Sequence, residues 1–324
     1  MRELTIGVIG TSRKTDEKRY PIHLAHLMRI PEKLRKKMIF EQGYSAAFNM
    51  NDEEIAALTG GIATRSDILT QLGTIIIAKP VLADLQELKE GGTISGYVHC
   101  VQQQAITQAA LDRKLTLIAF EDMFVWSPQG NVGRHTFYKN NEMAGYCAVL
   151  HALQLKGIEG EARLIVVEHD GSQRPLTELI SEADIIVNGT YQETANPVNF
   201  VIESEADCLK PNSLIIDVSC DEGMGFFFAK PTTFKHPMFS YKTTDYYAVD
   251  HTPSYLWESA TRSISAALIV YLPTVLAGPE QWQKDETIRR AINIEHGIIK
   301  NNAILAFQNR ESAPPYHLQI ADIT

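Results

Sequence analysis

The segment GTIIIAKP, residues 73–80, is a continuous run of mostly β-branched residues between a glycine and a proline. A run of this kind is typical of a strand that is buried on both faces of a parallel sheet. A short helical pattern follows and ends at two glycines, and a second strand pattern, TISGYVHC, covers 93–100. Another helical pattern and the strand pattern LTLIAFEDM (115–123) continue the series. The alternation predicts an α/β protein with a doubly wound parallel sheet.

The same alternation extends in both directions from this segment. LTIGVIG (4–10) is typical of a first strand, and 52–72 has helical periodicity that breaks at Gly60-Gly61. A stretch rich in glycine, proline and asparagine covers 125–140 and predicts a domain boundary. A long helix is expected over 141–157, because the apolar pattern there ends at a glycine.

The second half of the chain repeats the strand and helix pattern. Strands are expected over 162–169, 184–190 and 213–223 and a terminal helix over 285–305, whereas the tail from Glu311 is polar and expected to be loose. We therefore predict two Rossmann-like doubly wound domains, of which the second is truncated. The substrate (catalytic) domain comprises 1–128 and 257–324, and the dinucleotide-binding domain comprises 129–256.

Composition excludes several classes of protein. The 324 residues carry a formal net charge of −9, which argues against a nucleic-acid binder. No run approaches the length of apolar sequence that a membrane span needs, so no membrane partner is expected. The 4 cysteines are far apart and form no CxxC pair, which argues against zinc and against a disulfide framework. Scattered reduced thiols are typical of a cytoplasmic protein, and no metal site is expected.

The loop after the first strand resembles a phosphate loop only at first sight. A dinucleotide loop has G-x-G-x-x-G at the start of a helix, but here Gly7 and Gly10 are three apart and a cluster of charges follows. Arg13, Lys14, Lys18 and Arg19 belong to that cluster. Two interpretations stay open: a solvated run of charges, or an arginine that binds a substrate carboxylate through its two-pronged guanidinium.

Two basic side chains follow strands of the first predicted sheet. Lys79 comes at the end of GTIIIAK, and His99 comes at the end of GYVHC. Each alone is more often structural than functional, but two at the carboxyl ends of strands in one sheet face the same crevice. A histidine can move a proton near neutral pH, and a desolvated lysine can polarise a carbonyl. Acidic residues at other strand ends, among them Asp217, Asp221 and Asp250, are candidates for function or for helix caps.

Several of these motifs in order resemble a known family. The series EKRYPIH, IIIAKP, GYVHC, NNEMAG, IIDVSCDEG and AVDHTPSYLWESAT is similar to the group of alanine dehydrogenase, the transhydrogenase catalytic subunit and fungal-type saccharopine dehydrogenase. The nearest likeness is to the opine-type N5-(carboxyethyl)ornithine synthases. The resemblance runs from residue 4 to about residue 275 and implies an oligomeric oxidoreductase of amino acid metabolism that uses NADP or NAD.

The resemblance also implies roles for individual residues. Arg19 would bind the carboxylate of a 2-oxo acid, Lys79 would bind and polarise its carbonyl or the imine, and His99 would be the acid and base. Tyr97 would join Arg19, Lys79 and His99 in binding substrate. Asp221 would lie between substrate and nicotinamide and count with Lys79 and His99 as catalytic. The expected cofactor-binding residues are Asn141, Asn188, Gly189, Asp221 and Asp250.

One part of the family pattern is absent from the sequence. The long helix ends near Lys156 and the next strand begins near Ala162, so a βαβ unit with its glycine-rich loop has no room. Gly157 and Gly160 follow a helix rather than a strand, and the Gly223 and Gly225 pair leads into FFF. Three explanations stay open for the missing βαβ unit. It is deleted, or it belongs to the natural protein but not to this sequence, or the cofactor binds in another way.

Three functions therefore stay open. The first is NAD(P)H-dependent reductive condensation of a pyruvate-like 2-oxo acid with an ornithine-like amino acid, carried out by a homo-oligomer. The second is a remnant without catalysis that binds an amino acid, an oxo acid or a protein. The third is an alanine-type amino-acid dehydrogenase, in which ammonia replaces the organic amine. Whether the chain is an enzyme depends on the missing loop, because cofactor binding orients the nicotinamide.

Overall fold

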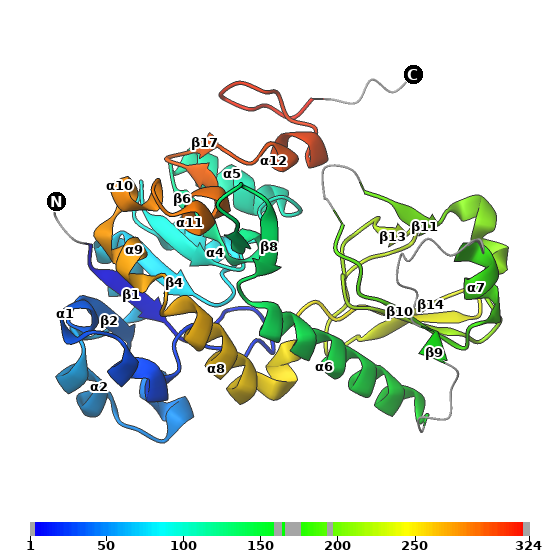
Figure 1. Cartoon of the computed structure of the whole chain (residues 1–324), viewed down its shortest axis with the longest axis horizontal. Helices are drawn as coiled ribbons and strands as arrows, with labels where there is room; N and C mark the ends of the chain where they lie inside the picture. The colour runs from blue at the N-terminus through cyan, green and yellow to red at the C-terminus, as the bar shows by residue number, and fades with distance from the viewer. Residues whose placement is uncertain (1–3, 159–163, 166–175, 193–196, 320–324) are drawn as a thin grey trace. The chain divides into compact units, whose positions relative to one another are not determined.

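The computed structural model describes residues 4–158, 164–165, 176–192 and 197–319. The chain divides into two compact units. Unit 1 comprises Met1–Asn140 and Leu256–Thr324, and unit 2 comprises Asn141–Tyr255. Unit 1 is thus built from both ends of the chain, blue to green and orange to red in Figure 1.

Unit 1 contains an eight-stranded sheet in the order β17-β16-β6-β5-β4-β1-β2-β3. The six strands from β6 to β3 are parallel, and β16 and β17 add an antiparallel edge. The strands are β1 (Ile6–Ile9), β2 (Met38–Glu41), β3 (Gly61–Ala63), β4 (Thr74–Ile77), β5 (Thr93–Gly96), β6 (Thr116–Ala119), β16 (Ile292–Glu295) and β17 (Ile298–Ile299). The predicted doubly wound α/β sheet is confirmed.

The segment from which the fold was predicted lies in the middle of this sheet. Ile76 of β4 packs in the hydrophobic core on one face, whereas Ile75 and Ile77 pack in the core on the other face. All three are fully buried. Successive side chains of a strand point to opposite faces, so a continuous apolar run belongs where both faces are covered. Helices and 3₁₀ turns cover the two faces.

The helical elements of unit 1 are mostly short. They are η1 (Leu24–Arg29), α1 (Glu32–Arg35), η2 (Tyr44–Phe48), α2 (Asp52–Leu58), α3 (Arg65–Asp67), η3 (Ile68–Leu72), α4 (Leu82–Glu87), α5 (Gln104–Asp112), η4 (Phe120–Asp122), α8 (Trp257–Leu268), α9 (Leu272–Ala277), α10 (Pro279–Trp282), α11 (Glu286–Ala291) and α12 (Asn302–Phe307). An antiparallel hairpin, β7 (Phe124–Trp126) and β8 (Val132–His135), forms within the stretch that was expected to be a domain boundary.

The predicted terminal helix over 285–305 is wrong. Only α11 at its start and α12 at its end are helical, and β16 and β17 form between them. His296 and Gly297 link the two strands with φ of +49° and +75°. Two successive residues with positive φ make the tight turn that suits a twisted hairpin, and isoleucines on both sides favour strands. The tail is not loose throughout either, because Tyr316 is buried against the core.

Unit 2 has its own five-stranded sheet in the order β14-β15-β12-β10-β9, and a pair β11-β13. β9, β10, β12 and β15 are parallel, whereas β14 is antiparallel to β15. The strands are β9 (Leu164–Ile165), β10 (Ile185–Asn188), β11 (Asn199–Val201), β12 (Leu214–Asp217), β13 (Gly225–Phe226), β14 (Met238–Tyr241) and β15 (Thr244–Tyr247). The helical elements are α6 (Tyr138–Lys156), α7 (Leu176–Glu182), η5 (Glu203–Cys208) and η6 (Thr252–Leu256).

The central strand of unit 2 is buried in the same way as β4. Leu214 and Ile216 of β12 belong to one hydrophobic cluster and Ile215 to another. The strand expected over 162–169 is described only at β9, and the rest of that range lies outside the described residues. β9 is the last strand of the sheet in the part of the chain that the structure describes.

Candidate active site

The loop after β1 is held by a buried carboxylate. Glu41, the last residue of β2, accepts hydrogen bonds from the backbone N–H groups of Gly10 and Thr11, each 3.0 Å long, and from the Thr11 hydroxyl. Arg65 forms an ion pair with Glu41 at 3.1 Å and another with Asp84 at 2.7 Å. The N–H groups that a phosphate would need are therefore occupied by a carboxylate of the protein itself.

Gly10 has a packing role at this place. A Cβ on Gly10 would lie 2.6 Å from Tyr20 Cε1 and 2.7 Å from Tyr44 Cδ2. Only a residue without a side chain lets the end of β1 come so close to two aromatic rings. This glycine therefore serves aromatic packing.

The charge cluster of the loop divides into separate environments. Arg13 bonds to Glu87 through two hydrogen bonds of 2.8 Å and lies 3.5 Å from Asp84, so it fixes the loop to α4. Arg19 is buried, with 4% of its surface exposed. Its Nε and Nη2 donate to the two oxygens of Glu17 at 2.8 and 2.6 Å, and Nη1 donates to Asn140 Oδ1 at 3.1 Å. The carboxylate that Arg19 binds in this structure is thus the one of Glu17.

Glu17 is ionised in the folded protein. Burial acts to raise its pKa, but the charge of Arg19 and the hydrogen bonds from it act more strongly together and, with the charge of Lys79, lower the pKa to about 2. A buried ion pair of this kind needs both partners, because either one alone would be an uncompensated charge.

Lys79, Tyr97 and His99 follow the strands β4 and β5 and gather beside this ion pair. Lys79 is buried, and its charge lowers the pKa of both Glu17 and Glu121. The Tyr97 ring lies 5.4 Å from the Arg19 guanidinium carbon and is stacked on the His99 ring at 6.2 Å. The structure therefore brings Arg19, Lys79, Tyr97 and His99 together at the carboxyl ends of neighbouring strands.

Glu121 joins Arg19, Lys79, Tyr97 and His99 from the end of a third strand. It follows β6, and its Oε1 accepts the backbone N–H of His99 at 2.5 Å. His99 has a φ of +45°, a conformation that few residues other than glycine adopt. Burial, then the charge of Asp122, raises the pKa of Glu121 to about 8, although the His99 N–H and Lys79 act to lower it. Asp122 in turn accepts a hydrogen bond from Asn293 of β16 at 2.7 Å, and burial raises its pKa.

Two buried polar atoms of this group lack a partner among the described residues. They are the Tyr97 hydroxyl oxygen and Glu121 Oε2. Burial also raises the pKa of Tyr97, so its hydroxyl stays protonated and can donate. Unsatisfied buried polar groups are rare in folded proteins, and a bound molecule is one way to satisfy them.

The pH dependence of stability should report the state of Glu121. Its pKa is about 8 in the folded protein and about 4.3 in an unfolded chain, so between these values the folded state keeps a proton that the unfolded state has released. Stability should therefore fall as the pH rises through this window. Glu121→Gln cannot ionise, and its urea midpoint should fall less than the wild-type midpoint between about pH 5 and about pH 9.

The matched control for this prediction is Glu53→Gln, which changes an exposed glutamate of α2. Its midpoints should follow the wild-type pH dependence. Identical pH dependence for Glu121→Gln and wild type would show that Glu121 is not held in its protonated form.

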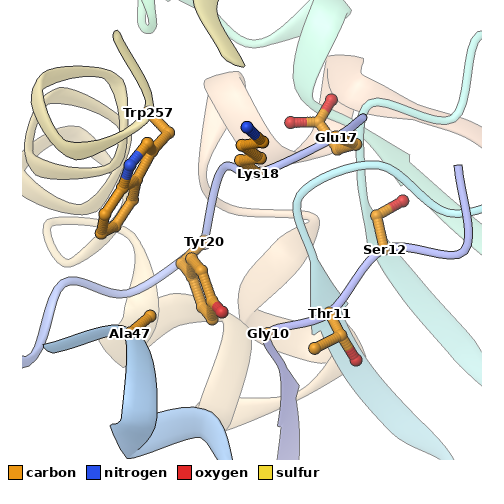
Figure 2. A pocket seen from close by; sticks show the side chains of 8 residues that line it. All are labelled: Gly10, Thr11, Ser12, Glu17, Lys18, Tyr20, Ala47 and Trp257. Atoms are coloured by element: carbon orange, nitrogen blue, oxygen red, sulfur yellow. The ribbon is translucent and has the colours of Figure 1, made fainter. Parts of the chain in front are cut away.

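A pocket of about 300 Å³ lies beside the buried group within unit 1 (Figure 2). Its lining residues are Gly10, Thr11, Ser12, Glu17, Lys18, Tyr20, Ala47 and Trp257. Ser12 donates a 2.7 Å hydrogen bond to the backbone oxygen of Lys79, and Glu17 is the ion-pair partner of Arg19. The pocket thus shares residues and contacts with the candidate active site.

The other candidates lie at the corresponding edge of the sheet in unit 2. Asn188 ends β10 and Gly189 follows it, Asp221 follows β12 and Asp250 follows β15. The Asn188 amide donates to buried Asp217 at 3.0 Å, and Asp250 lies 2.8 Å from the ring of His251. Asp217 also accepts hydrogen bonds from the backbone N–H groups of Ser219 and Cys220, so it holds the loop after β12, where no described helix begins. Asn141 lies in the first turns of α6 and is exposed.

The glycines of the described residues do not form a site for a dinucleotide pyrophosphate. Gly157 ends α6 with a φ of +64°, and its N–H donates back to Gln154, as in a helix C-cap. A Cβ on Gly225 would lie 2.8 Å from the Asn188 amide nitrogen, so this glycine allows close packing in unit 2. Gly160 lies outside the described residues. The described residues, which leave out 159–163 and 166–175, therefore do not fit this part of NAD(P).

Sequence reasoning missed Glu17, Glu121 and Asn140. Glu121 had a usable signal, because it lies near the end of the predicted strand 115–123, in the same predicted sheet as the strands of Lys79 and His99. Glu17 stands two residues before Arg19 in a run of charges, and its pairing depends on the course of the loop. Among the residues described, no helix is long and apolar enough to cross a membrane, and no group of three metal-binding side chains comes together.

Comparison with known proteins identifies the family. Residues 136–302 match the family model "Alanine dehydrogenase/PNT, C-terminal domain", which is more than half of the chain. The chain therefore belongs to the alanine dehydrogenase/PNT family, a family of oxidoreductases, and the resemblance seen in the sequence motifs is confirmed.

Individual relatives agree with this assignment. The N(5)-(carboxyethyl)ornithine synthase of Clostridium botulinum is 24% identical over 280 residues, covering 74% of this chain and 86% of that protein. The alanine dehydrogenase of Mycolicibacterium smegmatis is 19% identical over 356 residues, covering 91% and 95%. A solved structure of L-alanine dehydrogenase superposes with a TM-score of 0.69 at 14% identity over 94% of this chain and 99% of that one, which shows the shared fold. The mycobacterial alignment is longer than the 324 residues of this chain, so that relative contains residues without a counterpart here.

Proposed function

We propose that the chain is an opine-type oxidoreductase that condenses a pyruvate-like 2-oxo acid with the amine of an ornithine-like amino acid and reduces the product. The observation that carries this proposal is the group formed by Arg19, Lys79, Tyr97 and His99, in which the buried Tyr97 hydroxyl has no partner among the described residues. The name of the clostridial relative supports the choice of an ornithine-like amine.

The chain's own residues suit the condensation half of this reaction. The cations of Arg19 and Lys79 attract the carboxylate of the oxo acid, and the Lys79 ammonium polarises its carbonyl. The amine nitrogen attacks the carbonyl carbon and the carbonyl oxygen leaves as water, which produces an imine. The nitrogen loses two protons and the oxygen gains two before it leaves as water, and His99 carries each proton from the nitrogen to the oxygen. The Tyr97 hydroxyl donates a hydrogen bond to the oxo acid.

Reduction of the imine needs a hydride, which a nicotinamide cofactor, NADP or NAD, supplies in dehydrogenases. Asn141, Asn188, Gly189, Asp221 and Asp250 are our candidates for contact with that cofactor. The proposal includes a cytoplasmic homo-oligomer, and the exposed apolar side chains of Tyr146 and Leu150 on α6 are surface that a second copy would cover.

A second candidate function follows from the glycines. Because the described residues do not fit a pyrophosphate, the chain could instead be a binding protein for an amino or oxo acid that no longer catalyses. The alanine-type dehydrogenase is the third candidate, supported by the family match. Its site would be the same, with ammonia as the amine.

One pair of measurements separates these candidates. We expect the fluorescence of NADPH or NADH to change on titration with the protein, and nucleotide oxidation to require pyruvate together with L-ornithine. Oxidation with pyruvate and ammonium alone would select the amino-acid dehydrogenase. A cofactor with a Kd of about 1 mM has a binding free energy of only about 4 kcal/mol. If no binding is seen even at about millimolar cofactor, the oxidoreductase is rejected and the non-catalytic binding protein remains.

A further inference from the structure

The pocket next to the candidate active site has walls of two kinds. Tyr20 and Trp257 form an aromatic wall, whereas Glu17, Lys18, Thr11 and Ser12 supply polar groups (Figure 2). Its volume of about 300 Å³ is at the lower end of the range for small-molecule sites. A ligand that suits it is small, has an aliphatic part and is charged.

The aromatic wall is rigid. The Tyr20 ring meets Tyr44 edge-on with centroids 5.0 Å apart, and it meets Phe48 in the same way at 5.2 Å. Phe48 also packs edge-on against Trp257 at 6.0 Å. The Tyr20 backbone N–H donates to Thr261 of α8 at 3.0 Å, which ties the loop to the helix that begins with Trp257. Four interlocked rings hold the wall in place without a ligand, so binding loses little side-chain entropy.

The polar groups give the pocket a direction. Glu17 lines the pocket, but its side chain is 0% exposed and its two carboxylate oxygens accept hydrogen bonds from Arg19, so its charge is already paired inside the protein. Aromatic faces favour a cation and the methylene groups beside it. Lys18 adds a positive charge that suits a carboxylate at another point of the same ligand.

From this arrangement we infer that the pocket is the subsite for the amine-bearing substrate, an amino acid with a linear aliphatic chain that ends in a second amine. The aliphatic chain and its terminal ammonium lie against Tyr20 and Trp257, and the carboxylate meets Lys18. This inference rests on the proposed function, because it assigns the second substrate of that reaction. A 2-oxo acid as small as pyruvate binds at Arg19 and Lys79 and does not need the aromatic wall.

The experiment is calorimetric titration of the full chain with L-ornithine, L-alanine and pyruvate in turn. Wild type should bind L-ornithine at least about tenfold more tightly than L-alanine, which lacks the chain. Trp257→Ala should weaken L-ornithine binding by about tenfold and leave the Kd of pyruvate within about twofold of wild type, because only the former uses the ring. Trp257→Phe keeps an aromatic face and should restore most of the affinity.

Trp126→Ala is the matched control, because Trp126 is a half-buried tryptophan of unit 1 that does not line the pocket. It should bind L-ornithine as wild type does, and circular dichroism should show that all the variants are folded. Unchanged L-ornithine affinity in Trp257→Ala, or no L-ornithine binding by folded wild type, would overturn the inference. Binding of L-ornithine through Trp257 without any turnover would reject the proposed reaction and leave the subsite in place.

Discussion

Replacing Arg19 by alanine should destabilise unit 1 by about 3–5 kcal/mol. Arg19 and Glu17 are buried and joined by hydrogen bonds of 2.8 and 2.6 Å, so loss of the guanidinium leaves a buried carboxylate without its partner. The free energy of unfolding in urea measures the effect. The double variant Arg19→Ala, Glu17→Gln should recover part of the loss, because it removes the stranded charge as well.

Acid unfolding gives the same ion pair a second signature. The pKa of Glu17 is lowered to about 2 in the folded protein, against about 4.3 in an unfolded chain. The stability it contributes is complete above about pH 4.3 and disappears as the pH falls toward about 2. Glu17→Gln should lack this part of the acid dependence. If Arg19→Ala were as stable as wild type, or if Glu17→Gln kept the full acid dependence, the pair would not be the element that holds this loop.

Replacing His99 by asparagine should lower kcat for reductive condensation by about 10²–10⁴. Asparagine tolerates the positive φ of +45° at this position, so the variant should fold while it loses the imidazole that moves the protons. The KM for pyruvate should change by less than about threefold, because the cations of Arg19 and Lys79 remain.

The control for this variant is His317→Asn, which alters an exposed histidine near the end of unit 1 and should leave both constants unchanged. A fall in pyruvate affinity with unchanged kcat would assign His99 to binding rather than to proton transfer. Turnover of His99→Asn within about threefold of wild type would remove it from the reaction.

The parallel strands in the middle of the unit 1 sheet could be predicted from the sequence, whereas the strands at its edges could not. The runs at β1, β4 and β6 are mostly apolar because both faces of these strands are covered, and such runs can be recognised in the sequence alone. The β16 and β17 hairpin was not predicted, because its isoleucines also fit a helical period and the deciding feature is a two-residue turn at His296 and Gly297. β2 and β3 pair with strands more than 20 residues away, and β3 is too short for a clear pattern.

The candidate site shows the same division. Lys79 and His99 could be found because strand ends of a parallel sheet meet at one edge. That Arg19 binds Glu17, or that Glu41 binds the N–H groups of the first loop, could not be found, since each pairing depends on how two loops fold back. Tyr20 and Trp257 are 237 positions apart, and only the return of α8 to unit 1 makes them walls of one pocket.

The end of the unit 2 sheet at β9 has a consequence for engineering this chain. β10 pairs with β9 on one side and β12 on the other, and β9 is the outermost strand among the described residues. A sheet that ends in this way can be extended by adding strands without rearranging those already paired. Splicing a complete strand–loop–helix–strand unit from a relative between Gly157 and Leu164 would therefore be a modular change, and it offers a way to learn whether one insertion is enough to restore nucleotide affinity to such a protein.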